Sequence, residues 1–209
     1  AMDAGIPVIA IDTGVSGAEV TSFVATDNQA VAKVQGSVAA TLVADGDAII
    51  YVTGNQAQST GQERRDGFMA GFTAARPNSE VIVVPTEWNS QQAQEGVEAI
   101  LNSRDDIKMV ANAWDGGTMG AKAALENLGY GAGDVKLVGF DGASDAIVAM
   151  DAGWVHANTA QMLYQMGYQG IKAAAAAARG EDVAGRIDTG FFLVTPETSS
   201  VYKDMVGIK

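Results

Sequence analysis

The fold is decided by four apolar segments: Ile49-Ile50-Tyr51-Val52, Val81-Ile82-Val83-Val84, Met109-Val110-Ala111 and Leu137-Val138-Gly139-Phe140. The strands that contain them begin near positions 48, 80, 107 and 135, so they recur every 27 to 32 residues. This interval is the length of a strand–helix–strand unit, and near-continuous apolar strands are typical of parallel sheets covered on both faces. We therefore predict an α/β fold with parallel sheets flanked by helices.

Helical patterns fill the intervals between these strands. Apolar residues recur at helical spacing over 31–42, 93–101 and 121–128, and Gly129 follows the last of these at the usual C-terminal position. One more strand is expected at Ile6–Ile11. Two weak strands, around Val155 and at Phe191–Val194, bracket an Ala-rich helix from about Met162 to Ala178.

Charge and composition exclude several classes of function. The 209 residues include 13 Lys and Arg against 25 Asp and Glu, a net charge of −12, so we expect no nucleic-acid partner. The chain has no Cys and one His, His156, which argues against thiol catalysis, a zinc site and a Ser-His-Asp triad. We expect no metal, no cofactor and no catalytic residue. No apolar run approaches the ~20 residues of a membrane span.

Polar and aromatic residues cluster just after the predicted strands. Ligands of open parallel α/β sheets bind beyond the carboxyl ends of the strands. The candidates at these ends are Asp12, Thr13, Gln58, Thr60, Arg64, Trp88, Asn112, Trp114, Asp141 and Gln161. Carboxylates and Arg hold hydroxyls through charge-assisted hydrogen bonds, and indole faces pack against C–H surface. This combination predicts a site for a small sugar or polyol.

Several candidates also have a purely structural interpretation. Asp12 and Asp141 are residue types that commonly form turns at strand ends. Asp115 is interpreted as the cap of a helix that begins near it. Trp88 and Trp114 would ordinarily be core residues, but the polar residues beside them favour a cleft.

Five short motifs occur in order along the chain: Gly5-Ile6-Pro7-Val8-Ile9-Ala10-Ile11-Asp12, Ala25-Thr26-Asp27-Asn28, Glu63-Arg64-Arg65-Asp66-Gly67-Phe68, Val138-Gly139-Phe140-Asp141-Gly142, and Ala160-Gln161 followed by Gly167. Together they resemble the periplasmic sugar-binding proteins of the ribose/galactose type, over nearly the whole chain. The resemblance implies the type I periplasmic binding protein fold, with two Rossmann-like lobes that close over the ligand. It also implies delivery of a sugar to an ABC transporter permease. The expected location is the periplasm, or the cell exterior on a membrane anchor in a one-membrane bacterium.

The resemblance assigns roles by position. Asp12 would bind sugar hydroxyls from the first lobe. From the second lobe, Arg64 would hold a hydroxyl or the ring oxygen, and Asp141 would accept a pair of hydroxyls. Trp88 falls where the family places a stacking aromatic, and Gln161 would reach the ligand from a hinge crossing.

Two positions depart from the ribose binders of that family. Thr13 stands where they have an Arg, and Trp114 stands where they have an Asn. An indole in place of an amide removes hydrogen bonds and adds apolar surface. We therefore expect a less polar, deoxygenated or differently shaped polyol in place of ribose.

The family carries two or three further strand–helix units ahead of the position of Gly5. The resemblance therefore implies an incomplete first lobe, with residues 1–27 and 159–189 as its remnants and residues 28–158 and 190–209 as the second lobe. With no visible signal peptide, the chain is predicted to be a fragment. Strand Ile6–Ile11 and helix Met162–Ala178 would then expose apolar faces, so we also expect self-association.

Two rival functions are weighed against sugar import. The same fold serves as the sugar-sensing domain of LacI-type regulators, although the charge of −12 and the tail from Ile187 to Glu197 favour a transport protein. A sugar-acting enzyme would need a carboxylate pair, such as Asp12 and Asp141, with one raised pKa. The sequence shows no nucleophile–base pair, so we expect binding without catalysis.

Overall fold

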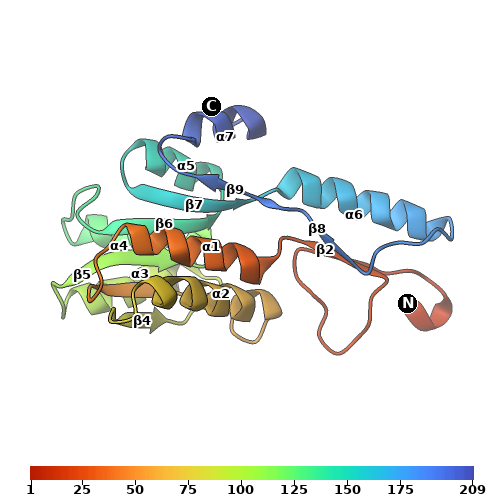
Figure 1. Cartoon of the computed structure of the whole chain (residues 1–209), viewed down its shortest axis with the longest axis horizontal. Coiled ribbons are helices and arrows are strands. Elements are labelled where there is room, and N and C mark those ends of the chain that lie inside the picture. Colours follow the sequence, from red (N-terminus) through yellow and green to blue (C-terminus); the bar gives the residue numbers. More distant parts are fainter.

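A six-stranded sheet of order β4-β3-β5-β6-β7-β9 forms the larger part of the molecule in the computed structural model, which describes residues 1–209 (Figure 1). Its strands are β3 (Ala48–Val52), β4 (Val81–Val84), β5 (Ile107–Asn112), β6 (Lys136–Asp141), β7 (Val155–Gln161) and β9 (Phe191–Val194). All neighbours pair in parallel except β9, which is antiparallel to β7 at the edge. The predicted α/β fold is confirmed, with this one antiparallel strand added.

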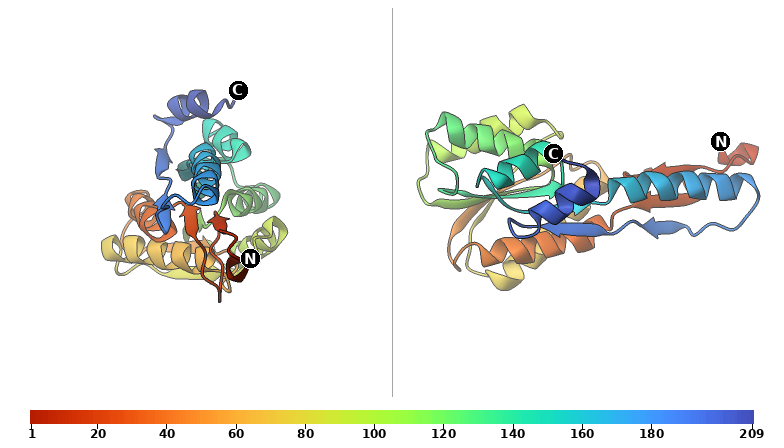
Figure 2. Two further views of the ribbon diagram at one scale, coloured as in Figure 1. Left: turned by 90° about the vertical axis from the view of Figure 1, so that its right-hand side faces the viewer. Right: turned by 90° about the horizontal axis from the view of Figure 1, so that it is seen from above.

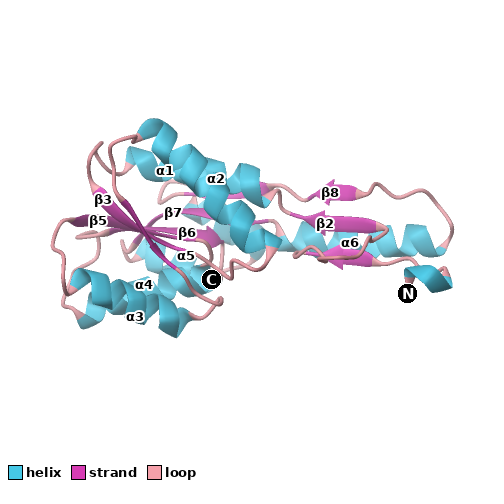
Figure 3. Cartoon of the chain, turned by 90° about the horizontal axis from the view of Figure 1, so that it is seen from below, coloured by secondary structure: helices cyan, strands magenta, loops and turns pink.

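Helices cover both faces of this sheet. α1 (Asn28–Thr41) and α2 (Ser59–Ala75) lie on one face, and α3 (Ser90–Leu101) and α4 (Asp115–Asn127) lie on the other (Figure 3). Two shorter helices, α5 (Ser144–Asp151) and α7 (Ser199–Val206), pack against each other. Helix α4 ends as predicted, because Gly129 follows it with a φ of 82°.

Helices α1 and α2 approach so closely that their backbones nearly touch. A Cβ on Gly36 would lie 2.2 Å from the carbonyl oxygen of Phe68, and one on Gly71 would lie 2.1 Å from that of Lys33. Glycine is therefore required at both contacts. Beneath these helices, the ring of Phe68 stacks on Tyr51, with 4.2 Å between the centroids.

A smaller sheet projects from this body as an arm, together with one long helix (Figures 1 and 2). Its strands β1 (Ile9–Ile11), β2 (Ser22–Ala25) and β8 (Arg186–Asp188) are parallel in the order β1-β2-β8, and α6 (Leu163–Ala178) packs on β1 and β2. A short 3-10 helix, Met2–Ala4, lies near the N-terminus. We call residues 1–27 and 163–188 the arm and the remainder the body.

The arm has a much smaller core than the body. Its buried apolar cluster holds Val24, Met166 and Ala173, whereas the body has a cluster of 34 buried residues. The arm's sheet is therefore covered by a helix on one face, and the predicted coverage of both faces holds only for the body.

Some boundaries differ from those predicted. The first strand begins at Ile9, not at Ile6, and Pro7 within the predicted part has no N–H to donate to a ladder. Strands β2 and β8 were not predicted, since they are short and include polar residues. Strand β7 continues to Gln161, so the predicted lobe boundary at residue 158 falls inside a strand. Otherwise the division into two lobes remains our proposal.

No helix of the structure combines the length and apolar character that a membrane crossing requires.

Candidate ligand-binding site

A cavity of about 320 Å³ lies between the arm and the carboxyl ends of the body's strands. Its lining residues are Asp12, Thr13, Gln58, Thr60, Arg64, Trp88, Trp114, Asp141 and Gln161. All nine are among the ten candidates from the sequence. The structure thus brings these side chains together, and their contact with a ligand stays a prediction.

The remaining candidate, Asn112, differs from the expectation. It is the last residue of β5 and is fully buried, with its Nδ2 3.3 Å from the carbonyl oxygen of Val138 on the neighbouring strand. Its side-chain amide thus lies against the backbone of the sheet, and Asn112 does not line the cavity.

Three cavity residues have an unusual backbone conformation. The φ angles of Asp12, Trp88 and Asp141 are 70°, 58° and 108°, and these are the only non-glycine residues of the chain with positive φ. Such conformations cost about 1–3 kcal/mol each and persist where the surroundings enforce them, often at ligand sites. For a bulky Trp a positive φ is especially uncommon. Their convergence on one cavity therefore favours a binding role over simple turn formation.

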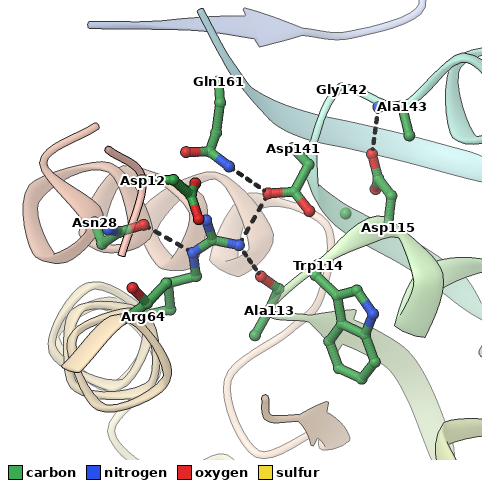
Figure 4. Close-up of polar contacts among 12 residues, drawn as sticks. Asp12, Asn28, Arg64, Ala113, Trp114, Asp115, Asp141, Gly142, Ala143 and Gln161 are labelled. Atoms are coloured by element: carbon green, nitrogen blue, oxygen red, sulfur yellow. Dashed lines mark hydrogen bonds and ion pairs between the residues drawn. The ribbon is translucent and has the colours of Figure 1, made fainter. Parts of the chain in front are cut away.

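Arg64 is held in place by the body before any ligand arrives. It is 3% exposed, and its Nε donates to Asn28 Oδ1 at 2.8 Å. Its Nη1 donates to the carbonyl of Ala113 at 2.7 Å and to Asp141 Oδ1 at 2.9 Å (Figure 4). The ring of Phe140 lies 4.0 Å from its Cζ. This leaves Nη2 as the guanidinium nitrogen that can donate to a ligand.

The two carboxylate oxygens of Asp141 have different surroundings. Its Oδ1 accepts from Arg64 and also from Gln161 Nε2 at 2.8 Å. No side chain donates to its Oδ2, and the side chain is 27% exposed, so a ligand hydroxyl can reach it. Burial raises the pKa of Asp141 above its ordinary value, and the charge of Arg64 and the hydrogen bond from Gln161 oppose that rise.

Asp115 and Asn158 clamp the turn that carries Asp141. Asp115 is the first residue of α4 and is buried, and its Oδ2 accepts the N–H of Ala143 at 2.7 Å. Its Oδ1 accepts from Asn158 Nδ2 at 2.7 Å, and Asn158 Oδ1 accepts the N–H of Gly142 at 3.0 Å. The two amides after Asp141 are thus fixed by acceptors from two other elements, Gly142 by Asn158 on β7 and Ala143 by Asp115 on α4.

The interpretation of Asp115 as a helix cap is therefore wrong. Residue Trp114 occupies the cap position, without a side-chain cap bond, and the carboxylate of Asp115 is directed at the β6–α5 turn. Burial raises the pKa of Asp115 well above its ordinary value, and the nearby charge of Asp141 adds to the rise.

The two indoles form one aromatic corner of the cavity. Trp88 and Trp114 meet edge to face, with 5.4 Å between ring centroids and 89° between planes. Trp88 Nε1 donates to Gln58 Oε1 at 2.6 Å. A Cβ on Gly54 would lie 2.1 Å from the Trp88 ring, so only glycine fits beneath it. Trp114 is 9% exposed and also belongs to the core, which its structural interpretation anticipated.

Asp12 and Thr13 form the arm's side of the cavity. Thr13 Oγ1 donates to Asp12 Oδ2 at 3.0 Å, and the Asp12 carboxylate points towards the guanidinium of Arg64 (Figure 4). Thr60 on the body is 3.5 Å from Thr13, between the two hydroxyl oxygens. Residues from both units therefore face one another across the cavity.

Comparison with models of known protein families identifies the family of this chain. The family model described as a periplasmic binding protein domain matches residues 1–182. The chain belongs to the periplasmic binding protein family. The resemblance inferred from the five sequence motifs is thereby confirmed.

Curated relatives of this periplasmic binding protein are sugar-binding proteins. The ribose import binding protein of Escherichia coli is 29% identical over 197 residues, which cover 94% of this chain and 66% of the relative. The D-allose-binding periplasmic protein of Escherichia coli is 32% identical over 158 residues, covering 75% of this chain and 50% of the relative. The chain thus spans less than two thirds of the length of these relatives.

Solved structures confirm the type I fold of this periplasmic binding protein. An ABC transporter solute binding protein from Mycobacterium smegmatis, with bound glycerol, is 32% identical with a TM-score of 0.87. The match covers 96% of this chain and 69% of that one. A second, from Bacillus halodurans with bound myo-inositol, is 28% identical with a TM-score of 0.88, covering 97% and 70%.

Sequence reasoning missed the residues that orient Arg64 and Asp141. Asn28 was noticed only as part of a motif, and Asn158 only as a polar residue near the end of a strand. The carbonyl of Ala113 carries no sequence signal at all, since every residue has one.

Proposed function

We propose that this protein is the solute-binding component of an ABC importer, and that a small sugar or polyol binds between the arm and the body. The observation that carries the proposal is the network of Arg64, Asp141 and Gln161, which leaves Nη2 and Oδ2 without a side-chain partner beside an aromatic corner. The relatives, described as import binding and periplasmic binding proteins, favour import over gene regulation or catalysis. The expected partner is the permease, and the expected location is the periplasm.

The chemistry of the cavity suits vicinal hydroxyls. Asp141 Oδ2 accepts from one hydroxyl while Arg64 Nη2 donates to its neighbour, both as charge-assisted hydrogen bonds. Asp12 accepts further hydroxyls from the arm, and the face of Trp88 packs on the C–H surface of the ring. The volume of about 320 Å³ falls within the range of small-ligand pockets.

Ribose fits this cavity less well than a less polar, deoxygenated or differently shaped polyol. Trp114 offers an apolar ring edge, and the hydroxyl of Thr13 already donates to Asp12. Neither residue supplies a positive charge to a ligand oxygen. The solved relatives at 28% and 32% identity hold myo-inositol and glycerol, which supports including polyols beside sugars.

Tryptophan fluorescence and calorimetry with a panel of pentoses, hexoses and polyols test the proposal. Two of the chain's three Trp residues line the cavity, so a ligand should produce a saturable change. Asp141→Asn should weaken that binding at least tenfold, about 1.4 kcal/mol, because the acceptor loses its charge. Asp105→Asn, the same change at an exposed position, should bind like the parent chain.

Two results would contradict the proposal. One is the absence of saturable binding by the folded chain with every member of the panel. The other is equal affinity of Asp141→Asn and the parent. Tight and selective binding of ribose would contradict only the expected choice of ligand. Release of product from a chromogenic glycoside would contradict the expectation of binding without catalysis.

A further inference from the structure

The turn that carries Asp141 has a third polar contact, which comes from the last helix of the chain. Asp141 ends β6, and the residues after it lead into α5. The N–H groups of Gly142 and Ala143 are held from β7 and α4, as described above. The carbonyl oxygen of Gly142 accepts the hydroxyl of Tyr202 on α7, with 3.0 Å between the two oxygens. Side chains from three different elements therefore bind the backbone of this turn.

Tyr202 packs so closely on Gly142 that no side chain fits between them. A Cβ on Gly142 would lie 2.3 Å from the Tyr202 hydroxyl and 2.4 Å from the side chain of Ala160 on β7. Tyr202 is 3% exposed, and its ring packs on Phe192 of β9 with 5.7 Å between ring centroids. The hydroxyl therefore reaches the turn in one fixed position.

Helix α7 is also anchored away from this turn. Ser199 Oγ donates to Asp151 Oδ1 at 2.8 Å, and Lys203 Nζ donates to Asp151 Oδ2 at 2.6 Å. Asp151 is the last residue of α5, whereas the turn lies before the first residue of that helix. Helix α7 is thus tied to one end of α5 by Ser199 and Lys203, and to the turn at its other end by Tyr202 (Figure 1).

The hydroxyl of Tyr202 remains a donor near neutral pH. Burial raises the pKa of Tyr202 above its ordinary value of 10.0, and the nearby charges of Asp115 and Asp141 add to the rise. The phenol therefore keeps its proton and can donate to the carbonyl. Gly142 is buried, and leaving a buried carbonyl without its donor costs about 1–3 kcal/mol.

This contact bears on the conformation of Asp141. The peptide unit that joins Gly142 to Ala143 is held at both polar ends, because Tyr202 donates to its C=O and Asp115 accepts from its N–H. Asp141 itself has a φ of 108°, a strained value that persists only where the surroundings enforce it. Without the hydroxyl, the peptide unit is free to rotate, and the strain at Asp141 can relax.

We propose that Tyr202 is a positioning residue for ligand binding: it holds the turn that keeps Asp141 in its strained conformation, with Oδ2 presented to the cavity. Tyr202 does not line the cavity, so it acts through Asp141 and not by touching the ligand. The expected effect on affinity rests on the proposed function, whereas the effect on the turn can be measured without a ligand.

Calorimetry with the panel member that the parent chain binds tests the effect on affinity. Tyr202→Phe removes the hydroxyl and keeps the ring, and it should weaken binding about three- to tenfold, the effect of one buried hydrogen bond. Tyr51→Phe is the matched control, because Tyr51 is also fully buried in the body but its hydroxyl has no hydrogen-bond partner. It should bind like the parent chain. Circular dichroism of each variant checks that it is folded.

A second background separates positioning from a general loosening of the fold. If Tyr202 acts through Asp141, Tyr202→Phe should weaken binding less in the Asp141→Asn chain than in the parent chain, because the charge to be positioned is already lost. The same fold-loss in both backgrounds would overturn the positioning role. So would equal affinity of Tyr202→Phe and the parent chain.

Amide hydrogen exchange, followed by NMR on the ligand-free chain, tests the hold on the turn. The N–H groups of Gly142 and Ala143 should exchange faster in Tyr202→Phe than in the parent chain, and at the parental rate in Tyr51→Phe. Unchanged exchange in Tyr202→Phe would overturn the proposal even if its affinity fell. A parent chain that binds no member of the panel would overturn the proposed function and the effect on affinity, and the exchange rates would still decide whether Tyr202 holds the turn.

Discussion

At the scale of single residues, the site depends on buried charges whose partners come from distant parts of the chain. Arg64 meets Asn28, Ala113 and Asp141, which lie on three different elements or loops. A Lys at this position would keep the charge but lose the planar fork that serves three acceptors at once. Arg64 Nη2 and Asp141 Oδ2, which have no side-chain partner, are thus presented by a rigid frame, and this lowers the entropy lost on ligand binding.

The titration of Asp115 yields a prediction at the same scale. Burial raises the pKa of Asp115, so the folded protein keeps this proton at pH values where the unfolded chain, with the ordinary value of 3.8, has released it. The contribution of Asp115 to the free energy of unfolding therefore falls as the pH rises above about 3.8, until the pKa of Asp115 in the folded protein is passed. Asp115→Asn removes this titration.

Urea unfolding at several pH values checks the effect of Asp115. The slope of the free energy of unfolding against pH should be more positive in Asp115→Asn than in the parent chain, and Asp105→Asn should keep the parental slope. A more negative slope in Asp115→Asn would contradict the assignment of a raised pKa. An Asn side chain has one acceptor oxygen, so it cannot replace both carboxylate oxygens that accept from Ala143 and Asn158. Asp115→Asn should therefore also bind the ligand more weakly than Asp105→Asn does.

At the scale of elements, glycines decide how closely α1 and α2 can pack. Gly36→Ala would drive a Cβ into the Phe68 carbonyl, so the helices must separate, at a cost of about 1–3 kcal/mol. Gly167→Ala on α6 meets no atom within 4 Å, so it should stabilise its helix by up to about 1 kcal/mol. Thermal unfolding of the two variants should therefore give shifts of opposite sign. A shift to higher temperature in Gly36→Ala would show that the helices do not pack as closely as described.

At the scale of the whole molecule, the cavity joins two units that have very different cores. Asp12 is the arm's charged residue in the cavity, and its only side-chain hydrogen bond is from its neighbour Thr13. Asp12→Asn should therefore leave the melting temperature of the ligand-free chain unchanged. It should reduce the rise in melting temperature that saturating ligand produces, because that rise measures affinity for the folded state.

Thermal scans with and without the ligand identified from the panel check this prediction, with Asp3→Asn as the control on an exposed residue of the arm. An equal rise in Asp12→Asn and in the control would place the ligand on the body alone.

The sequence by itself determined the α/β fold, the order of the body's strands along the chain and all nine residues that line the cavity. It could do so because strand and helix periodicities are local, and because the residues that follow parallel strands necessarily share one edge. Only the tertiary structure decided that Asp115 supports the turn of Asp141 and that Asn112 is buried at the end of β5. These features depend on contacts between elements distant in sequence, and no local pattern records which strand lies beside another.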